Sequence, residues 1–146
     1  MVKQLTDRKV VVIGGTSGMG LATAQLAVEA GASVVVTGRS STHFDGARAR
    51  LGPDAEIFEL DVSSPDAVAA AFSRIGTLDY LAIPGGRPPV GSLSELSLAD
   101  ARAGFENRFW GQWYAVREAA PRLPPDGSIV LVAGAGSQQP GIGGVG

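Results

Sequence analysis

The sequence predicts an α/β domain in which a doubly wound parallel sheet is covered by helices on both faces. Short β-branched runs alternate with helical segments along the chain, and most positions of these runs are apolar. Such strands are typical of a parallel sheet that is buried on both faces. Right-handed crossovers wind the sheet in two directions, so we expect a ligand crevice at the carboxyl ends of its strands. A flavodoxin-type fold is the alternative with the same alternation.

The first half of the chain predicts two buried strands around a helix. Lys9–Ile13 and Ser33–Thr37 are short β-branched runs, as expected of buried strands. Between them, Gly18–Ala30 has the pattern of a helix, and Gly31 is expected to cap its C-terminus. A short helix is expected at Ala47–Leu51.

The second half continues the same alternation. Pro65–Ile75 predicts a helix with Ser64 as its N-cap, because serine suits that position and proline suits the first helical residue. Leu98–Leu123 predicts one or two further helices. Three more strands are expected at Glu56–Leu60, Leu78–Ile83 and Ser128–Val132.

Composition narrows the class of protein. A chain of 146 residues corresponds to one domain, taken as residues 1–146. The net charge of −2 disfavours nucleic-acid partners, which usually require a basic surface. The absence of cysteine excludes disulfides and thiolate chemistry, and His43 alone cannot build a multi-histidine metal site. A polar N-terminus and the lack of a long apolar run argue against a signal peptide or a membrane span, so a cytoplasmic protein is expected.

A glycine-rich turn joins the first strand to the first helix. Such a turn exposes unpaired amides at a helix N-terminus, where the helix dipole also attracts a phosphate. Its glycines suit positive φ angles and a close approach of the backbone to a diphosphate. A merely flexible turn is the alternative. The expected cofactor contacts here are Gly14, Thr16, Ser17, Gly18, Met19 and Gly20.

The spacing Gly-x-x-x-Gly-x-Gly at Gly14, Gly18 and Gly20 resembles the short-chain dehydrogenase/reductase family, although Ile13 stands where that family usually has threonine. The resemblance extends over essentially the whole chain. It implies a three-layer Rossmann domain with strand order 3-2-1-4-5. It also implies an oxidoreductase that uses a nicotinamide dinucleotide and acts on a small alcohol or carbonyl substrate.

The end of the second strand favours NADP(H) over NAD(H). Folds that bind NAD place an acid there to bond the ribose 2′-hydroxyl, whereas this chain has Arg39 and Ser40. An arginine pairs with a 2′-phosphate that a carboxylate would repel. A solvated surface arginine is the alternative reading of Arg39. Asp61 and Val62 resemble the family's adenine-binding pair, and a turn before the next helix is the alternative for Asp61.

The resemblance also shows what this chain lacks. The family's catalytic pair is Tyr-x-x-x-Lys, in which the lysine lowers the tyrosine pKa. Here Tyr80 and Tyr114 are followed four residues later by Pro84 and Glu118. By the family's spacing, the tyrosine would fall just past Gly146. The domain is therefore expected to be incomplete at its C-terminus.

Other catalytic positions depart from the family pattern. The fourth strand leads into Gly85 and Gly86, which keep a close approach to the cofactor plausible, but not into the family's asparagines. Aligned on Gly111, the family's helical Asn-x-x-Gly pattern places Arg108 at the asparagine position. Asn107 is turned from that position by about 100° on a regular helix, so it is predicted not to substitute.

In the fifth strand, Gly134 stands at the family's serine position and Ser137 follows three residues later. Arg108 and Ser137 are therefore the candidates for catalysis. Two functions remain open: a reductase with altered chemistry, or a non-catalytic NADP(H)-binding regulatory or scaffold relative.

Exposed apolar groups predict a homo-oligomer. In the predicted order the fifth strand lies at an edge, and apolar edges invite pairing with another chain. The long helical segment also carries the aromatic residues Phe109, Trp110, Trp113 and Tyr114.

Overall fold

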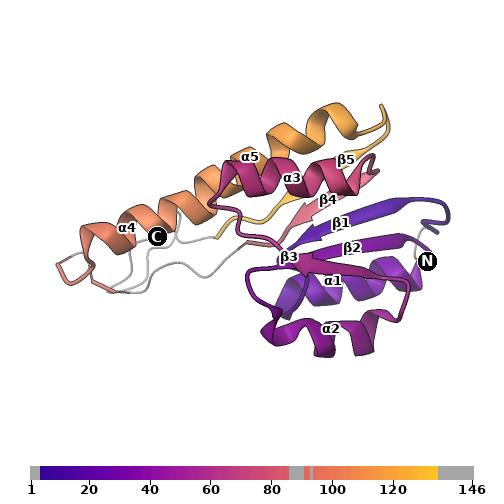
Figure 1. Cartoon of the computed structure of the whole chain (residues 1–146), viewed down its shortest axis with the longest axis horizontal. Helices are drawn as coiled ribbons and strands as arrows, with labels where there is room; N and C mark the ends of the chain where they lie inside the picture. The colour runs from indigo at the N-terminus through magenta and orange to yellow at the C-terminus, as the bar shows by residue number, and fades with distance from the viewer. Residues whose placement is uncertain (1–3, 86–90, 93, 135–146) are drawn as a thin grey trace.

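The computed structural model describes residues 4–85, 91–92 and 94–134 of the chain. Within them, five strands form one parallel sheet in the order β3-β2-β1-β4-β5, which confirms the predicted topology (Figure 1). The strands are β1 Lys9–Ile13, β2 Ser33–Gly38, β3 Glu56–Glu59, β4 Tyr80–Ile83 and β5 Ser128–Leu131.

Helices cover both faces of the sheet, so the predicted three layers are present (Figure 1). One face carries α1 (Gly18–Glu29) and α2 (Phe44–Leu51). The other carries α3 (Pro65–Ile75) and a longer helical segment. This segment consists of α4 (Leu98–Phe105), the π-turn η2 (Glu106–Trp110), α5 (Gly111–Ala119) and the 3-10 turn η3 (Ala120–Arg122). Another 3-10 turn, η1 (Ser41–His43), precedes α2.

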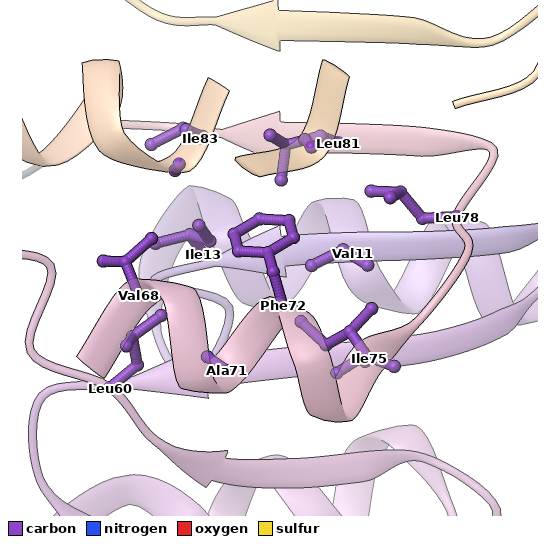
Figure 2. Packing of buried hydrophobic residues seen from close by; sticks show 13 residues of the cluster. Val11, Ile13, Leu60, Val68, Ala71, Phe72, Ile75, Leu78, Leu81 and Ile83 are labelled. Carbon is purple, nitrogen blue, oxygen red and sulfur yellow. The ribbon is translucent and has the colours of Figure 1, made fainter. Parts of the chain in front are cut away.

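Two apolar clusters hold the layers together, one on each face of the sheet. Alternate residues of β1 point to opposite faces, so Val11 packs on the side of α3 and α5 while Val12 packs on the side of α1 and α2. Phe72 of α3 is fully buried at the centre of the first cluster, against β1 and β4 (Figure 2). Burying a side chain of this size contributes about 2–3 kcal/mol.

The helix ends follow the predicted signals. Ser64 caps α3, because its hydroxyl accepts from the amide of Ala67 at 3.2 Å. Gly31 has a φ of +90°, and the amide of Ala32 reaches back to the carbonyl of Ala27 at 3.0 Å. This is a Schellman-type ending that favours glycine. The helix predicted at residues 47–51 is longer, since α2 begins at Phe44, which packs against the second cluster.

None of the helices in this part of the chain combines the length and apolar character that crossing a bilayer requires.

Candidate functional site

A cleft of about 440 Å³ lies at the carboxyl ends of the strands, where the topology predicts a ligand crevice. It has two walls. The sheet wall comes from the ends of β1 to β4 and consists of Ile13, Gly14, Thr37, Gly38, Arg39, Leu60, Val62, Ile83 and Gly85. The helix wall comes from the segment around the π-turn and consists of Leu96, Asp100, Ala103, Gly104, Asn107, Gly111 and Gln112. Figure 1 shows α4 projecting beyond the strand ends, while α5 lies beside α3.

The glycine-rich turn begins at the floor of this cleft. Gly14 and Gly18 have positive φ angles of 77° and 53°, which disfavour other L-residues. The amides of Gly14 and Gly15 both donate to the carbonyl oxygen of Thr37 at 3.0 Å, so the turn is fixed to the end of β2. The space in front of Gly18 is open, because a Cβ built there would meet no atom within 4 Å.

Gly20 serves a different purpose from the one the sequence suggests. A Cβ at this position would overlap the carbonyl group of Gly14 rather than face the space in front of the turn. The residue is buried, in contrast to exposed Gly18. Glycine is therefore required at position 20 because α1 packs directly on its own leading turn.

The N-terminus of α1 keeps its amides open. Ser17 occupies the N-cap position, but its side chain forms no capping hydrogen bond. The first intrahelical bond runs from the amide of Leu21 to the carbonyl of Ser17 at 3.1 Å, which leaves the preceding amides without helical acceptors. Ser17, Gly18 and Met19 are exposed. The turn is therefore not capped by its own side chains, and it fits a diphosphate. Thr16 is buried and packs against Gly38 instead.

The end of β2 presents a cation to the same cleft. Arg39 lines the cleft and is exposed. Ser40 is also exposed, and its hydroxyl donates to the hydroxyl of Thr42 at 3.1 Å. The strand end itself carries no carboxylate. The position of Arg39 is thus compatible with an anion such as a 2′-phosphate.

Asp61 forms a tight local turn. One of its carboxylate oxygens accepts from the amide of Ser63 at 2.9 Å and from the hydroxyl of Ser63 at 2.7 Å. These two bonds lower the pKa of the Asp61 carboxyl, and the charge of Arg39 contributes in the same direction. Asp61 therefore forms a turn before the next helix, as one of its two predicted roles requires, and these bonds use only one of its two carboxylate oxygens. The neighbouring Val62 lines the cleft and packs against Gly111, where a Cβ would lie 2.7 Å from a Val62 methyl carbon.

The helix wall corrects the prediction about Asn107. Asn107 lines the cleft, whereas Arg108 is half-buried and is not among the lining residues. The reason is the π-turn, in which the amide of Gly111 donates to the carbonyl of Glu106, five residues back. With the extra residue in this turn, Asn107 stays on the same face as Gly111, while Arg108 is turned away from it. In a regular α-helix, Asn107 and Arg108 stand four and three residues before Gly111, and both would lie near its face, so the effect of the π-turn is to turn Arg108 away.

Three further positions complete the comparison with the sequence. Gly85 lines the cleft with a φ of +93°, and Pro84 is buried beside it. Gly86 and Ser137 lie outside the described residues.

Sequence reasoning did not identify several residues that line the cleft, among them Thr37, Asp100 and Gln112. The spacing of Asp100, Gly104 and Gly111 along one helix face could have indicated the helix wall.

The chain and its fold are similar to known proteins. The family model described as short chain dehydrogenase matches residues 8–146. Cis-4-hydroxycyclohexanecarboxylate dehydrogenase of Sinomonas cyclohexanicum is 34% identical over 139 residues, which covers 90% of this chain and 56% of that protein. The chain spans about half the length, or less, of the curated relatives it matches.

Solved structures are similar as well, among them two that match over 97% of the chain. One is an NADPH-bound short chain oxidoreductase from Pseudomonas aeruginosa PAO1 with an atypical catalytic center, with 27% identity, a TM-score of 0.88 and 60% of that chain covered. The other is a short chain dehydrogenase from Burkholderia cenocepacia J2315 in complex with NADP, with 29% identity, a TM-score of 0.86 and 61% of that chain covered.

Proposed function

The chain belongs to the short-chain dehydrogenase family, and from this premise we propose that the protein is an NADP(H)-dependent oxidoreductase acting on a small alcohol or carbonyl compound. The family consists of oxidoreductases that bind a nicotinamide dinucleotide. The choice of NADP(H), the substrate class and the activity of the whole protein belong to the proposal, because the chain spans only part of its relatives.

The open amides at the start of α1 carry the proposal. They lie next to Gly14, which lines the cleft, and no side chain caps them. Helix N-termini of this kind bind phosphate groups through backbone donors and the helix dipole. We assign the diphosphate of the cofactor to this turn, with contacts from residues 14 and 16–20. The close contact of Gly20 with Gly14 supports this indirectly, since it holds the turn in shape.

Arg39 supports the choice of NADP(H). Arg39 lines the cleft at the end of β2, where a 2′-phosphate would be expected, and Ser40 is next to it in the chain. Asp61 and Val62 would flank the adenine, and Gly85 and Gly86 would allow a close approach near the nicotinamide. The two solved structures described above contain NADPH and NADP, respectively, which agrees with this choice.

Bound NADP(H) would supply the hydride that passes to or from a carbonyl carbon. This chain's residues bind and orient the cofactor, and the chain contains no Tyr-x-x-x-Lys pair to transfer the accompanying proton. Of the two catalytic candidates, Arg108 is set back from the cleft by the π-turn. Asn107 is the better candidate for the position that the family gives to an asparagine.

A titration with NADPH and NADH tests the proposal. We expect the protein to bind NADPH more tightly than NADH, and Arg39→Asp to remove that preference. Arg48→Asp is the matched control, because Arg48 is an exposed arginine of α2 that does not line the cleft. Failure to bind either dinucleotide would refute the proposed function. Equal affinity for both would remove only the role of Arg39. Tight binding of NADPH without any reduction of carbonyl compounds would instead favour a non-catalytic relative.

The proposal includes two further properties. We place the protein in the cytoplasm, with small molecules rather than nucleic acid or membrane as partners. We also propose a homo-oligomer, because Phe105, Phe109 and Trp113 expose 69%, 57% and 46% of their surface along one helical segment.

A further inference from the structure

We propose that Asn107 and Gln112 form a carboxamide pair that hydrogen-bonds the edge of one of the cofactor's two bases. This inference rests on the proposed function and names two residues that would recognise the cofactor within the same cleft. The pair would recognise the edge of a base on which an amino group lies beside a hydrogen-bond acceptor. Adenine offers this at its exocyclic amine and ring nitrogens, and nicotinamide offers it at its carboxamide.

The π-turn places the two side chains on one wall. Asn107 and Gln112 are five residues apart, which is the hydrogen-bonding period of the turn that connects them. Both line the cleft, and both are half-buried. In a regular α-helix, residues five apart differ by about 140° around the axis and would not share a face. The pair therefore depends on this irregular turn.

Hydrogen bonding already orients one of the two amides. The Asn107 Nδ2 atom donates to the carbonyl oxygen of Ala103 at 2.8 Å, which leaves Oδ1 as an acceptor for other groups. No hydrogen bond joins the Gln112 side chain to another residue in the described part of the chain. Gln112 can therefore offer both a donor and an acceptor. Together the pair provides the complement of an amino group with an adjacent acceptor.

The rest of the cleft suits a flat ring. The sheet wall opposite the pair contributes apolar side chains from Leu60, Val62 and Ile83. The helix wall around the pair is small, with Gly104 and Gly111. A ring can therefore lie against the apolar wall with its edge toward the carboxamides. Partly buried amides are unfavourable without hydrogen-bond partners, so a bound base would satisfy groups that the cleft leaves open.

Binding of the two halves of the cofactor to the full chain tests the pair. The probes are 2′,5′-ADP for the adenine half and reduced nicotinamide mononucleotide for the nicotinamide half, measured by calorimetry. The variants are Asn107→Ala and Gln112→Ala, with Gln25→Ala as control because Gln25 is also half-buried but lies on α1 outside the cleft. Thermal melting of each variant establishes that it is folded.

We expect both cleft variants to weaken one probe by about 3- to 10-fold, the range of one or two hydrogen bonds, and to leave the other within about twofold. The affected probe identifies the base. If the wild-type protein binds the probes and neither cleft variant changes that binding, the proposed role of the carboxamide pair is refuted. The proposed function would remain intact. Equal weakening of both probes in a folded variant would also refute the role of the pair. If wild-type protein binds neither probe nor NADPH, the proposed function fails, and the pair fails with it.

Discussion

The guanidinium of Arg8 donates to the carboxylate of Asp79 at 2.7 Å, at the end of the sheet opposite the cleft. The other oxygen of Asp79 accepts from the backbone amide of Lys9 at 2.8 Å, and Arg8 reaches Asp126 at 2.7 Å. One arginine thus connects the chain just before β1, β4 and β5. The backbone of Asp79 is also bonded on both sides, because its amide donates to the carbonyl of Lys9 at 2.9 Å and its carbonyl accepts from the amide of Ser128 at 3.1 Å.

These contacts predict a pH dependence of stability. The hydrogen bond from the amide of Lys9, followed by that from Arg8, lowers the pKa of Asp79 in the folded chain. The contribution of the ionised Asp79 carboxylate to folding stability is therefore fully present above the carboxyl pKa of the unfolded chain, about 3.9. This contribution is lost as the pH falls through the lower pKa of the folded chain. We expect Asp79→Asn to reduce the melting temperature most at neutral pH, and the difference from wild type to shrink below about pH 4. A difference that is constant from pH 7 to pH 3 would contradict this.

Gly20→Ala is expected to destabilise the protein by about 2–4 kcal/mol, because the new methyl group would overlap the backbone of Gly14. Chemical unfolding measures this effect, and NADPH affinity should fall with it. Gly46→Ala is the control, since its Cβ would meet no atom within 4 Å and the residue lies in α2. That change should stabilise by about 0.5–1 kcal/mol. Similar effects at both positions would refute the packing argument.

Thr37→Val is expected to leave stability unchanged or raise it by about 1 kcal/mol. Thr37 is 1% exposed, and its hydroxyl lacks a hydrogen-bond partner among the described residues. Valine keeps the shape and removes a buried polar group. Thr23→Val serves as comparison, because the hydroxyl of Thr23 donates to the carbonyl of Met19 at 2.9 Å. A clear loss of stability in Thr37→Val would mean that the hydroxyl has a partner, such as a bound water.

Deletion of Phe109 is expected to convert the π-turn to a regular α-helix and to change the free energy of unfolding by no more than about 1 kcal/mol. The deletion leaves Asn107 three residues before Gly111, so both still face the cleft in a regular α-helix. Deletion of Arg117, in the regular part of α5, would instead rotate buried Ala119 away from the core and unfold the segment. Melting curves and a crystal structure of the first variant would measure this. Equal damage from both deletions would show that the prediction is wrong.

The exposed aromatic residues predict self-association. Phe109 and Trp113 lie along the outer side of the long helical segment, and Arg117 stacks on Trp113 at 5.4 Å from its ring centre. We expect sedimentation to show concentration-dependent association that the Phe109→Ser, Trp113→Ser double variant weakens. Leu26→Ser is the control, since Leu26 is also exposed but lies on α1. A wild-type protein that stays monomeric at every concentration would defeat the prediction.

Local signals account for most of the fold. The β-branched runs predicted all five strands within two residues at each end, and the strand order followed from the family resemblance. Ser64 and Gly31 predicted the helix ends, because caps depend on a few neighbouring residues. The glycine turn and Arg39 could likewise be placed at the cleft, because the carboxyl ends of parallel strands meet at one edge of the sheet.

The sequence by itself determined the layers, the glycine turn and the absence of a carboxylate at the end of β2, since each depends on residues close together in the chain. Only the tertiary structure decided which helical residues face the cleft. A single extra residue in the π-turn places Asn107 and Gln112 on one wall and turns Arg108 away from it, and no regular period of the sequence reports that insertion. It also decided the purpose of Gly20, which is set by contact with Gly14 rather than by the space in front of the turn.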